Sequence, residues 1–194
     1  VWYELCEWIV SLFFIFWGGV GKGGLNDVVI DVTSADGLQH LLTRLRGQPL
    51  LVGTTGKLPM EALEAYSQNA AVAVVSNFSA GVPLLLDLIR EAVRSMPDDW
   101  RVEVMEAHHD QKKDAPSGTA LRMIRAIEDG GGPVDPPTHS IRAGDTIGEH
   151  TIWLAGPGER IEIKHVATKR SVFAIGALRW ASWLQKQSPG LYTP

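Results

Sequence analysis

Short apolar runs alternate with helical periodicity between residues 27 and 79, and this alternation most constrains how the chain can fold. Each run is followed by a turn of small or polar residues, and each intervening stretch repeats leucine or alanine on one helical face. Strand, helix, strand, helix, strand with short turns predicts a parallel sheet with right-handed crossovers. The predicted segments are the strands DVVIDV (27–32), PLLV (49–52) and AVAVV (71–75), and the helices 35–47 and 60–69.

The second half of the chain predicts a different arrangement. Two alternating runs, EHTIWLAG (149–156) and ERIEIKHVA (159–167), are separated by Gly-Pro-Gly and indicate a hairpin. We expect a Pro-rich loop before them, over residues 133–148. The other predicted segments are a helix over 82–96, the strand RVEVME (101–106), a helix from Ser117 to the glycines at 130–132, and a last helix over 171–187.

Composition limits the function classes. The net charge is −4 with a pI near 5.9, which argues against a general nucleic-acid surface. The single cysteine, Cys6, excludes an internal disulfide framework and a Cys-based zinc site, and it is consistent with a reducing compartment. The apolar run WIVSLFFIFW (8–17) is too short to span a bilayer and lacks the positive flank of a signal peptide. We expect a buried strand or short helix there, with a membrane-facing segment as the alternative.

The stretch MEAHHDQKKDAPSGTA (105–120) carries the densest chemistry. His108 and His109 follow a strand, so their side chains point opposite ways. Lys112 and Lys113 follow, and the helix that begins near Ser117 presents free backbone N–H groups and the positive end of its dipole. Cations and a helix N-terminus directed at one place suit a substrate that bears carboxylates. A solvated basic loop is the alternative on pattern alone.

Two other interpretations of this stretch are disfavoured. Adjacent histidines do not have chelate spacing, so we expect no metal. Ser117 lacks the surroundings of a nucleophile, since nothing resembles the Gly-x-Ser-x-Gly elbow, and we expect it to cap the helix. Elsewhere, the loops GTTG (53–56) and SNFS (76–79) follow parallel strands at their carboxyl ends, where ligands of such sheets bind. These loops are candidates for binding a cofactor or substrate.

The run EAHHDQKKDAPSGTAL resembles the signature E-x-H-H-x-x-K-x-D-x-P-S-G-T-A of the 4-hydroxy-tetrahydrodipicolinate (dihydrodipicolinate) reductase family. The similarity extends from about Asp27 to Tyr192, through DVVIDVTSADG, LVGTTG, VVSNFSAGV, IRAGDTIGEHTI and ERIEIKHVATKR. Gln111 departs from a frequent histidine and Val32 from a phenylalanine. The Gly-rich turn that opens the family's first strand–helix unit is not matched, and WGGVGKGG (17–24) fits G-x-G-x-x-G only formally, because no helix is predicted after it.

The resemblance implies roles for named residues. His108 and Lys112 stand at the catalytic histidine and the proton-donating lysine. The implied substrate-binding residues are His109, Ser117, Gly118 and Thr119. The implied cofactor-binding residues, for NADPH or NADH, are Gly53, Thr54, Thr55, Val75, Ser76, Asn77 and Phe78.

The resemblance also implies an α/β fold in two parts. A truncated Rossmann-like parallel sheet domain would cover residues 1–79, with an atypical 1–24, completed by 170–194. An α+β substrate-binding and oligomerisation domain with a mixed sheet would cover 80–169. The implied function is reduction of 4-hydroxy-tetrahydrodipicolinate in lysine and diaminopimelate biosynthesis, by a tetramer in the cytoplasm or plastid stroma. The alternative is a non-catalytic fragment that binds a dicarboxylate and lacks the pyrophosphate cradle.

Overall fold

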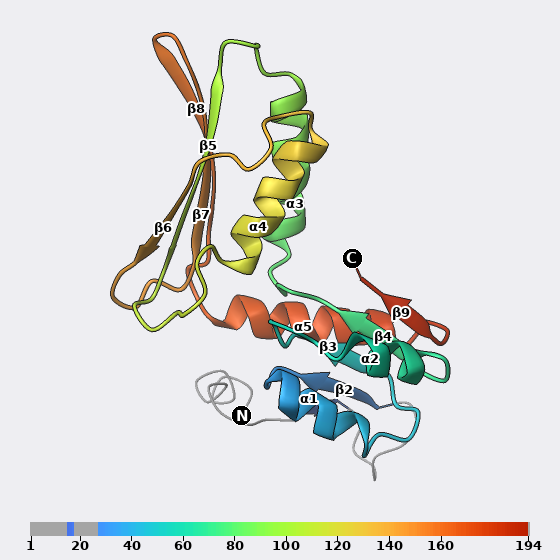
Figure 1. Cartoon of the computed structure of the whole chain (residues 1–194). Helices are drawn as coiled ribbons and strands as arrows, with labels where there is room; N and C mark the ends of the chain where they lie inside the picture. The colour runs from blue at the N-terminus through green and yellow to red at the C-terminus, as the bar shows by residue number, and fades with distance from the viewer. Residues whose placement is uncertain (1–14, 18–26, 194) are drawn as a thin grey trace. The chain divides into compact units, whose positions relative to one another are not determined.

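The computed structural model describes residues 15–17 and 27–193 (Figure 1). The chain divides into two compact units, here called unit 1 (Val1–Phe78 with Ser171–Pro194) and unit 2 (Ser79–Arg170). Of the apolar run 8–17, only Ile15–Trp17 is described, and it forms a strand. The rest of that run, and residues 18–24 of the glycine-rich segment, lie outside the described residues. No helix among the described residues is both long enough and apolar enough to cross a membrane.

Unit 1 is a five-stranded sheet in the order β1-β2-β3-β4-β9. Its strands β2, β3, β4 and β9 are parallel, and β1 runs antiparallel to β2. The predicted strand–helix alternation is therefore confirmed. In chain order the elements are β1 (Ile15–Trp17), β2 (Val28–Asp31), α1 (Ala35–Leu42), β3 (Leu50–Val52), α2 (Met60–Ser67), β4 (Ala71–Val74), α5 (Ser171–Leu184) and β9 (Gly190–Tyr192).

Both faces of this sheet are covered. Val28 and Ile30 of β2 pack with Ala177 and Ala181 of α5, whereas Val29 between them packs in a cluster with leucines of α1 and α2. Successive strand residues point to opposite faces, so α5 covers one face and α1 with α2 the other. A sheet buried on both sides explains why its strands read as continuous apolar runs.

Unit 2 is a mixed four-stranded sheet in the order β6-β5-β7-β8. Strand β5 runs parallel to β6 and antiparallel to β7, and β7 and β8 form the predicted hairpin. Helices α3 and α4 lie side by side over one face of the sheet and bury a common apolar core with it (Figure 1). The elements are α3 (Gly81–Arg94), β5 (Arg101–His108), α4 (Gly118–Asp129), β6 (Thr138–Arg142), β7 (Glu149–Gly156) and β8 (Glu159–Val166).

Two differences from the sequence prediction bear on the site. The predicted Pro-rich loop contains β6, an edge strand whose side chains are exposed or half-buried and therefore show no apolar alternation. Its backbone pairing with β5 holds it in the sheet. Strand β5 also continues two residues beyond the predicted end at Glu106, because Ala107 and His108 still pair with β6. His108 therefore lies inside the sheet rather than in the loop that follows it.

Candidate active site

At the carboxyl end of β5, polar side chains lie on the face of the sheet that is covered by α3 and α4. Val102, Val104, Glu106 and His108 alternate with more exposed residues along the strand and are all buried. The first two belong to the apolar core, and the last two continue the same face with a carboxylate and an imidazole. His109 lies just past the strand and is half-buried, whereas His108 is buried.

Glu106 is the centre of a buried hydrogen-bond network. Its side chain is fully buried, yet both carboxylate oxygens have partners. Arg142 of β6 donates to both, with Nη1 at 2.9 Å from Oε2 and Nη2 at 2.7 Å from Oε1. His108 Nδ1 lies 2.5 Å from Oε2, and the Ser117 backbone N–H donates to Oε1 over 3.3 Å. Such a bidentate, charge-assisted pair is the stronger kind of hydrogen bond.

These partners set the charge of the carboxyl group. Burial raises the pKa of Glu106, but hydrogen bonds from Arg142, Ser140 and His108 outweigh it and lower the pKa to about 2. For His108, burial is the largest influence and lowers the pKa, while the hydrogen bond and charge of Glu106 partly oppose it. At neutral pH the site therefore contains an ionised Glu106 beside a neutral His108.

Helix α4 begins against this network. The Ser117 hydroxyl accepts from Ala120 N–H over 3.2 Å, so the predicted helix cap is confirmed. The same oxygen lies 3.1 Å from His150 Nε2. Gly118 is exposed, and a side chain there would meet nothing within 4 Å, so the first turn is open to a ligand. Thr119 is buried at 7% exposure.

Two more imidazoles continue from His108 across the sheet. His150 of β7 packs edge-on against His108 with ring centroids 5.0 Å apart, and His165 of β8 follows at 6.4 Å. Burial, reinforced by the neighbouring His108, lowers the pKa of His150 to about 4. Burial also lowers the pKa of His165, whose Nε2 lies 3.1 Å from the Ser79 hydroxyl. Among the described residues, Nδ1 of each of these two histidines is buried without a hydrogen-bond partner.

The loop after β5 is tied to the same network. Arg142 Nη2 donates to the Asp114 carbonyl over 2.6 Å, and Lys112 Nζ donates to Asp114 Oδ1 over 2.7 Å. The Lys112 side chain is 22% exposed, while Lys113 is exposed. Lys112 is thus held at the rim of the site and is linked through Asp114 to the Glu106–Arg142 pair.

In unit 1 the predicted cofactor loops follow β3 and β4. Gly53 packs so closely against Phe78 that a Cβ would lie 2.5 Å from its ring. Thr54 is buried and donates its hydroxyl to the Asp31 carboxylate over 2.5 Å, and Thr55 is exposed. Thr33 donates to the other oxygen of Asp31 over 2.6 Å. The first loop therefore rests on a buried carboxylate at the end of β2.

The second loop contributes both buried and accessible residues. Val75 and Phe78 are buried in the core that underlies α5, so only their backbone could contact a ligand. Ser76 is exposed and Asn77 is half-buried. Val75 N–H donates to the Val52 carbonyl, which keeps the two loops side by side at the edge of the sheet.

Sequence reasoning missed Glu106, Arg142, His150 and Asp31. Glu106 lies two residues before His108, and that spacing puts both on one face of a strand, which could have revealed it. Arg142 carries no such signal, because it reaches the site through the unpredicted strand β6. His150 and Asp31 lie in runs that read simply as strands.

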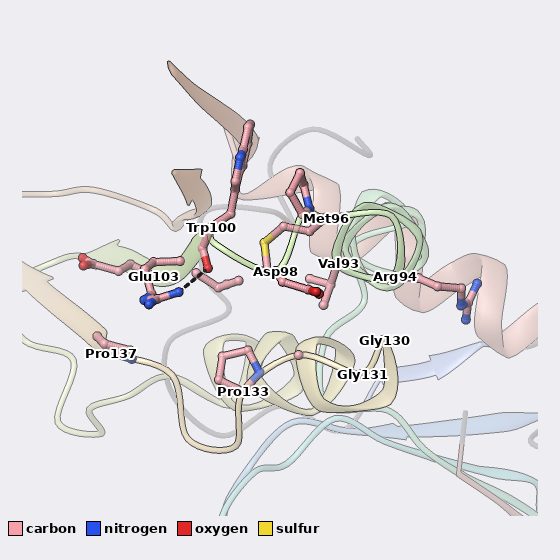
Figure 2. A pocket seen from close by; sticks show the side chains of 14 residues that line it. Val93, Arg94, Met96, Asp98, Trp100, Glu103, Gly130, Gly131, Pro133 and Pro137 are labelled. Atoms are coloured by element: carbon pink, nitrogen blue, oxygen red, sulfur yellow. Dashed lines mark hydrogen bonds between the residues drawn. The ribbon is translucent and has the colours of Figure 1, made fainter. Parts of the chain in front are cut away.

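A hollow in unit 2 lies away from these residues. It has a volume of about 580 Å³ and is lined by the end of α3, the start of β5 and the turn after α4 (Figure 2). Trp100 lies at its edge, where it packs over Gly156. His108 is seven residues further along β5 than Arg101, or roughly 23 Å at a strand's rise per residue. This hollow is thus at the opposite end of the strand from the site. In the described part of the chain, no group of three or more His, Cys, Asp or Glu side chains is placed to hold a metal.

Comparison with known proteins gives concordant results. A family model described as "Dihydrodipicolinate reductase, C-terminus" matches residues 81–194. The 4-hydroxy-tetrahydrodipicolinate reductase of Methanosarcina barkeri is 41% identical over 192 aligned residues, which cover 89% of this chain and 73% of the relative. The protein of the same name from Stenotrophomonas maltophilia is 44% identical over 170, covering 86% and 70%.

A dihydrodipicolinate reductase is among the solved structures that match the fold. It is described as a dipicolinate-bound dihydrodipicolinate reductase from Paenisporosarcina sp. TG-14, with a TM-score of 0.65 and 24% identity, and the match covers 86% of this chain and 71% of that one. This similarity supports the predicted α/β architecture of a parallel sheet and a mixed sheet.

Proposed function

Since this chain belongs to the 4-hydroxy-tetrahydrodipicolinate (dihydrodipicolinate) reductase family, we propose that it reduces 4-hydroxy-tetrahydrodipicolinate to tetrahydrodipicolinate with NADPH or NADH. Its curated relatives are reductases, and the family acts in lysine and diaminopimelate biosynthesis. The observation that supports the proposal best is the cluster of His108, Lys112 and the open first turn of α4 around one buried carboxylate.

The substrate is a dicarboxylate, and the first turn of α4 suits an anion. Backbone N–H groups at a helix start have no partner within the helix and lie at the positive end of its dipole. Gly118 and Thr119 lie in this first turn, and the open space at Gly118 lets a carboxylate approach the backbone. We propose that Lys112 and His109 bind the substrate from the loop side. The Ser117 hydroxyl already caps the helix and contacts His150, so its contribution is to hold this turn in place.

The loops of unit 1 fit a nicotinamide cofactor. They follow parallel strands at their carboxyl ends, as ligand loops of such sheets do, and Gly56 at the end of the first has a positive φ of 100° and open space around it. We propose that Gly53, Thr54 and Thr55, together with residues 75–78, hold the cofactor, mainly through backbone groups because Thr54, Val75 and Phe78 are buried. When bound, the cofactor supplies the hydride.

Reduction of the imine also requires a proton. Lys112 is held near the site by Asp114 and can donate one, and the neutral His108 lies at the same site with its own ring proton directed at Glu106. We propose that Lys112 delivers the proton and that His108 assists it. Positioning and charge are the protein's own contributions to the rate.

We further propose that the chain works as a tetramer joined through the sheet of unit 2. Strand alternation turns Ile141 and Val166 to the face opposite α3 and α4, where they are 52% and 41% exposed. The presence of one cysteine in the whole sequence supports a reducing location, either the cytoplasm or the plastid stroma. Light scattering on the purified chain tests the tetramer.

The test of the reaction is NADPH oxidation, with the substrate generated in place by the preceding enzyme of the pathway. We expect substrate-dependent oxidation by the wild type. Lys112→Ala should lower kcat by about 10²–10⁴-fold, the usual contribution of a general acid, while the Kd for NADPH stays nearly unchanged. Lys113→Ala is the matched control, because Lys113 is the exposed neighbour and should retain activity.

Two results would contradict the proposal. Equal losses of turnover and NADPH affinity in Lys112→Ala would remove its role as proton donor. No oxidation by the wild type, with a dicarboxylate such as pyridine-2,6-dicarboxylate still raising its Tm, would favour the alternative of a binding-only chain.

A further inference from the structure

We propose that Glu106, clamped by Arg142, is a positioning residue that holds His108 in one tautomer and leaves Nε2 as the nitrogen available to the substrate. The inference rests on the proposed function and extends it to two residues outside the predicted site. It follows from the hydrogen-bond geometry around one carboxylate.

Every partner of Glu106 must act as a donor. The Arg142 guanidinium and the Ser117 backbone N–H can only donate, so both oxygens of Glu106 accept hydrogen bonds. With an ionised carboxylate, the 2.5 Å contact to His108 Nδ1 requires a proton on Nδ1. The neutral imidazole then carries its lone pair on Nε2.

No side chain of residue 148 crowds Nε2, because that residue is a glycine. Gly148 lies beside it, and a Cβ at that position would be 3.2 Å from Nε2, closer than an ordinary contact. The ring is also braced by His150, which meets it edge-on at 5.0 Å. The imidazole is thereby fixed in both its orientation and its protonated nitrogen.

The same clamp extends to the other site residues. Arg142 Nη2 also bonds to the Asp114 carbonyl, and Asp114 holds Lys112. The Ser117 N–H contact joins the carboxylate to the start of α4. One buried ion pair therefore links the histidine, the lysine loop and the helix start that is proposed to bind a substrate carboxylate.

The charges that face His108 come from several elements. Glu106 on its own strand favours the protonated imidazole, whereas Arg142 of β6 and Lys112 of the following loop oppose it, as does His150 of β7 whenever it is charged. Burial lowers the pKa of His108 more than any of them. Removing Glu106 or Arg142 should therefore shift the pKa of His108 in opposite directions.

The test is the tautomer of His108 in the full chain, read from two-bond ¹H–¹⁵N correlations of ¹⁵N-histidine. We expect Nδ1–H in the wild type and Nε2–H in Glu106→Gln. A glutamine amide placed at Oε2 donates to Nδ1 and loses one bond, from Arg142 Nη1. Placed at Oε1, it would lose two bonds, from Arg142 Nη2 and Ser117 N–H, so the first orientation is favoured.

Glu103→Gln is the matched control. Glu103 lies on the same strand and also pairs with a residue of β6, His139, over 3.0 Å, but both side chains of that pair are largely exposed. This variant should leave the tautomer of His108 and its titration unchanged. The pKa of His108 should fall in Glu106→Gln and rise in Arg142→Gln.

Kinetics supply the link to the reaction. In Glu106→Gln the ring proton of His108 is expected on Nε2 instead of Nδ1. We therefore expect the kcat of this variant to fall at least tenfold, with a smaller change in KM. If Glu106→Gln folds and the tautomer of His108 is unchanged, the positioning role is overturned. If Glu106→Gln does not fold, Arg142→Gln decides: a fall in the pKa of His108 in that variant would overturn the positioning role. Absence of NADPH oxidation by the wild type would instead overturn the proposed function. The two failures are distinguishable, because the tautomer measurement does not depend on turnover.

Discussion

Among the described residues, both units have a carboxylate buried near the end of a strand, Asp31 in unit 1 and Glu106 in unit 2, and the partners of these two carboxylates differ. Asp31 at the end of β2 is held by two neutral hydroxyls, those of Thr33 and Thr54. Glu106 on β5 is held by a guanidinium, an imidazole and a backbone N–H. The first arrangement ties two loops together without introducing a second charge. The second creates a network in which charge, tautomer and loop position depend on one another.

This difference matches what the two regions are proposed to do. A cofactor loop needs a fixed backbone, and the hydrogen bonds from two hydroxyls to the Asp31 carboxylate provide it. A site that moves a proton needs groups whose charge responds to their neighbours, and burial next to charged partners provides it. The contrast can be tested by removing the equivalent part of each network.

The largest effect is expected for Glu106→Ala. This substitution removes the carboxylate partner of Arg142, whose side chain is 18% exposed, and of His108. The free energy of unfolding of unit 2 should therefore fall by about 3–5 kcal/mol, as when one member of a buried ion pair is deleted. Asp31→Ala removes the shared acceptor of two hydroxyls and leaves no charge unpaired, so it should destabilise unit 1 by about 1–3 kcal/mol. Hydrogen exchange of backbone amides in β5 and in β3 measures the stability of unit 2 and of unit 1 separately. A larger loss for Asp31→Ala would break the comparison.

A smaller effect is expected from acid. The pKa of His150 is lowered to about 4 from an ordinary 6.5, so the unfolded chain binds this proton first as pH falls. The resulting stability is complete above pH 6.5 and is lost as pH falls through 4, a change on the order of 2–3 kcal/mol. Melting curves between pH 7 and 4 should show this slope for the wild type and a flatter one for His150→Gln.

His40→Gln serves as the control for the acid experiment. His40 is an exposed histidine of α1 in unit 1, outside any buried network. Its replacement should keep the wild-type slope. If His150→Gln and the wild type lose stability in parallel between pH 6.5 and 4, the buried imidazole is not the source.

The smallest expected effect compares two helix caps. Ser34 caps α1 by accepting from Gly37 N–H over 3.1 Å at an exposed site, whereas Ser117 caps α4 at a buried site and also contacts His150. Ser34→Ala should cost about 0.5–1 kcal/mol and Ser117→Ala about 1–2 kcal/mol, the upper range for caps. Urea denaturation measures both. Equal losses would show that the His150 contact adds nothing to stability.

The sequence predicted the architecture well where burial imposes a pattern. The buried strands of unit 1 read as apolar runs, and the β7–β8 hairpin was visible from its Gly-Pro-Gly turn. Strand β6 was missed because an edge strand of exposed residues shows no such pattern. The resemblance supplied His108 and Lys112 as candidate catalytic residues, and their roles remain predictions.

The network behind those residues could not be obtained in the same way. Arg142 follows Glu106 by 36 positions, and only the parallel pairing of β5 with β6 brings them together. A contact that depends on the register between two strands cannot be predicted from the spacing of residues along the chain. The capping role of Ser117 was predictable, since cap and helix are local in sequence.

The interrupted chain path of unit 1 has a consequence for biosynthesis. Strand β9 pairs with β4, and α5 covers one face of the same sheet, yet both follow the whole of unit 2 in the sequence. During translation, the contiguous residues of unit 2 leave the ribosome before those of α5 and β9. Because domains generally fold as units as they emerge, unit 2 is expected to fold while one face of the unit 1 sheet is still bare. The nascent chain is therefore most in need of a chaperone in the interval before α5 emerges.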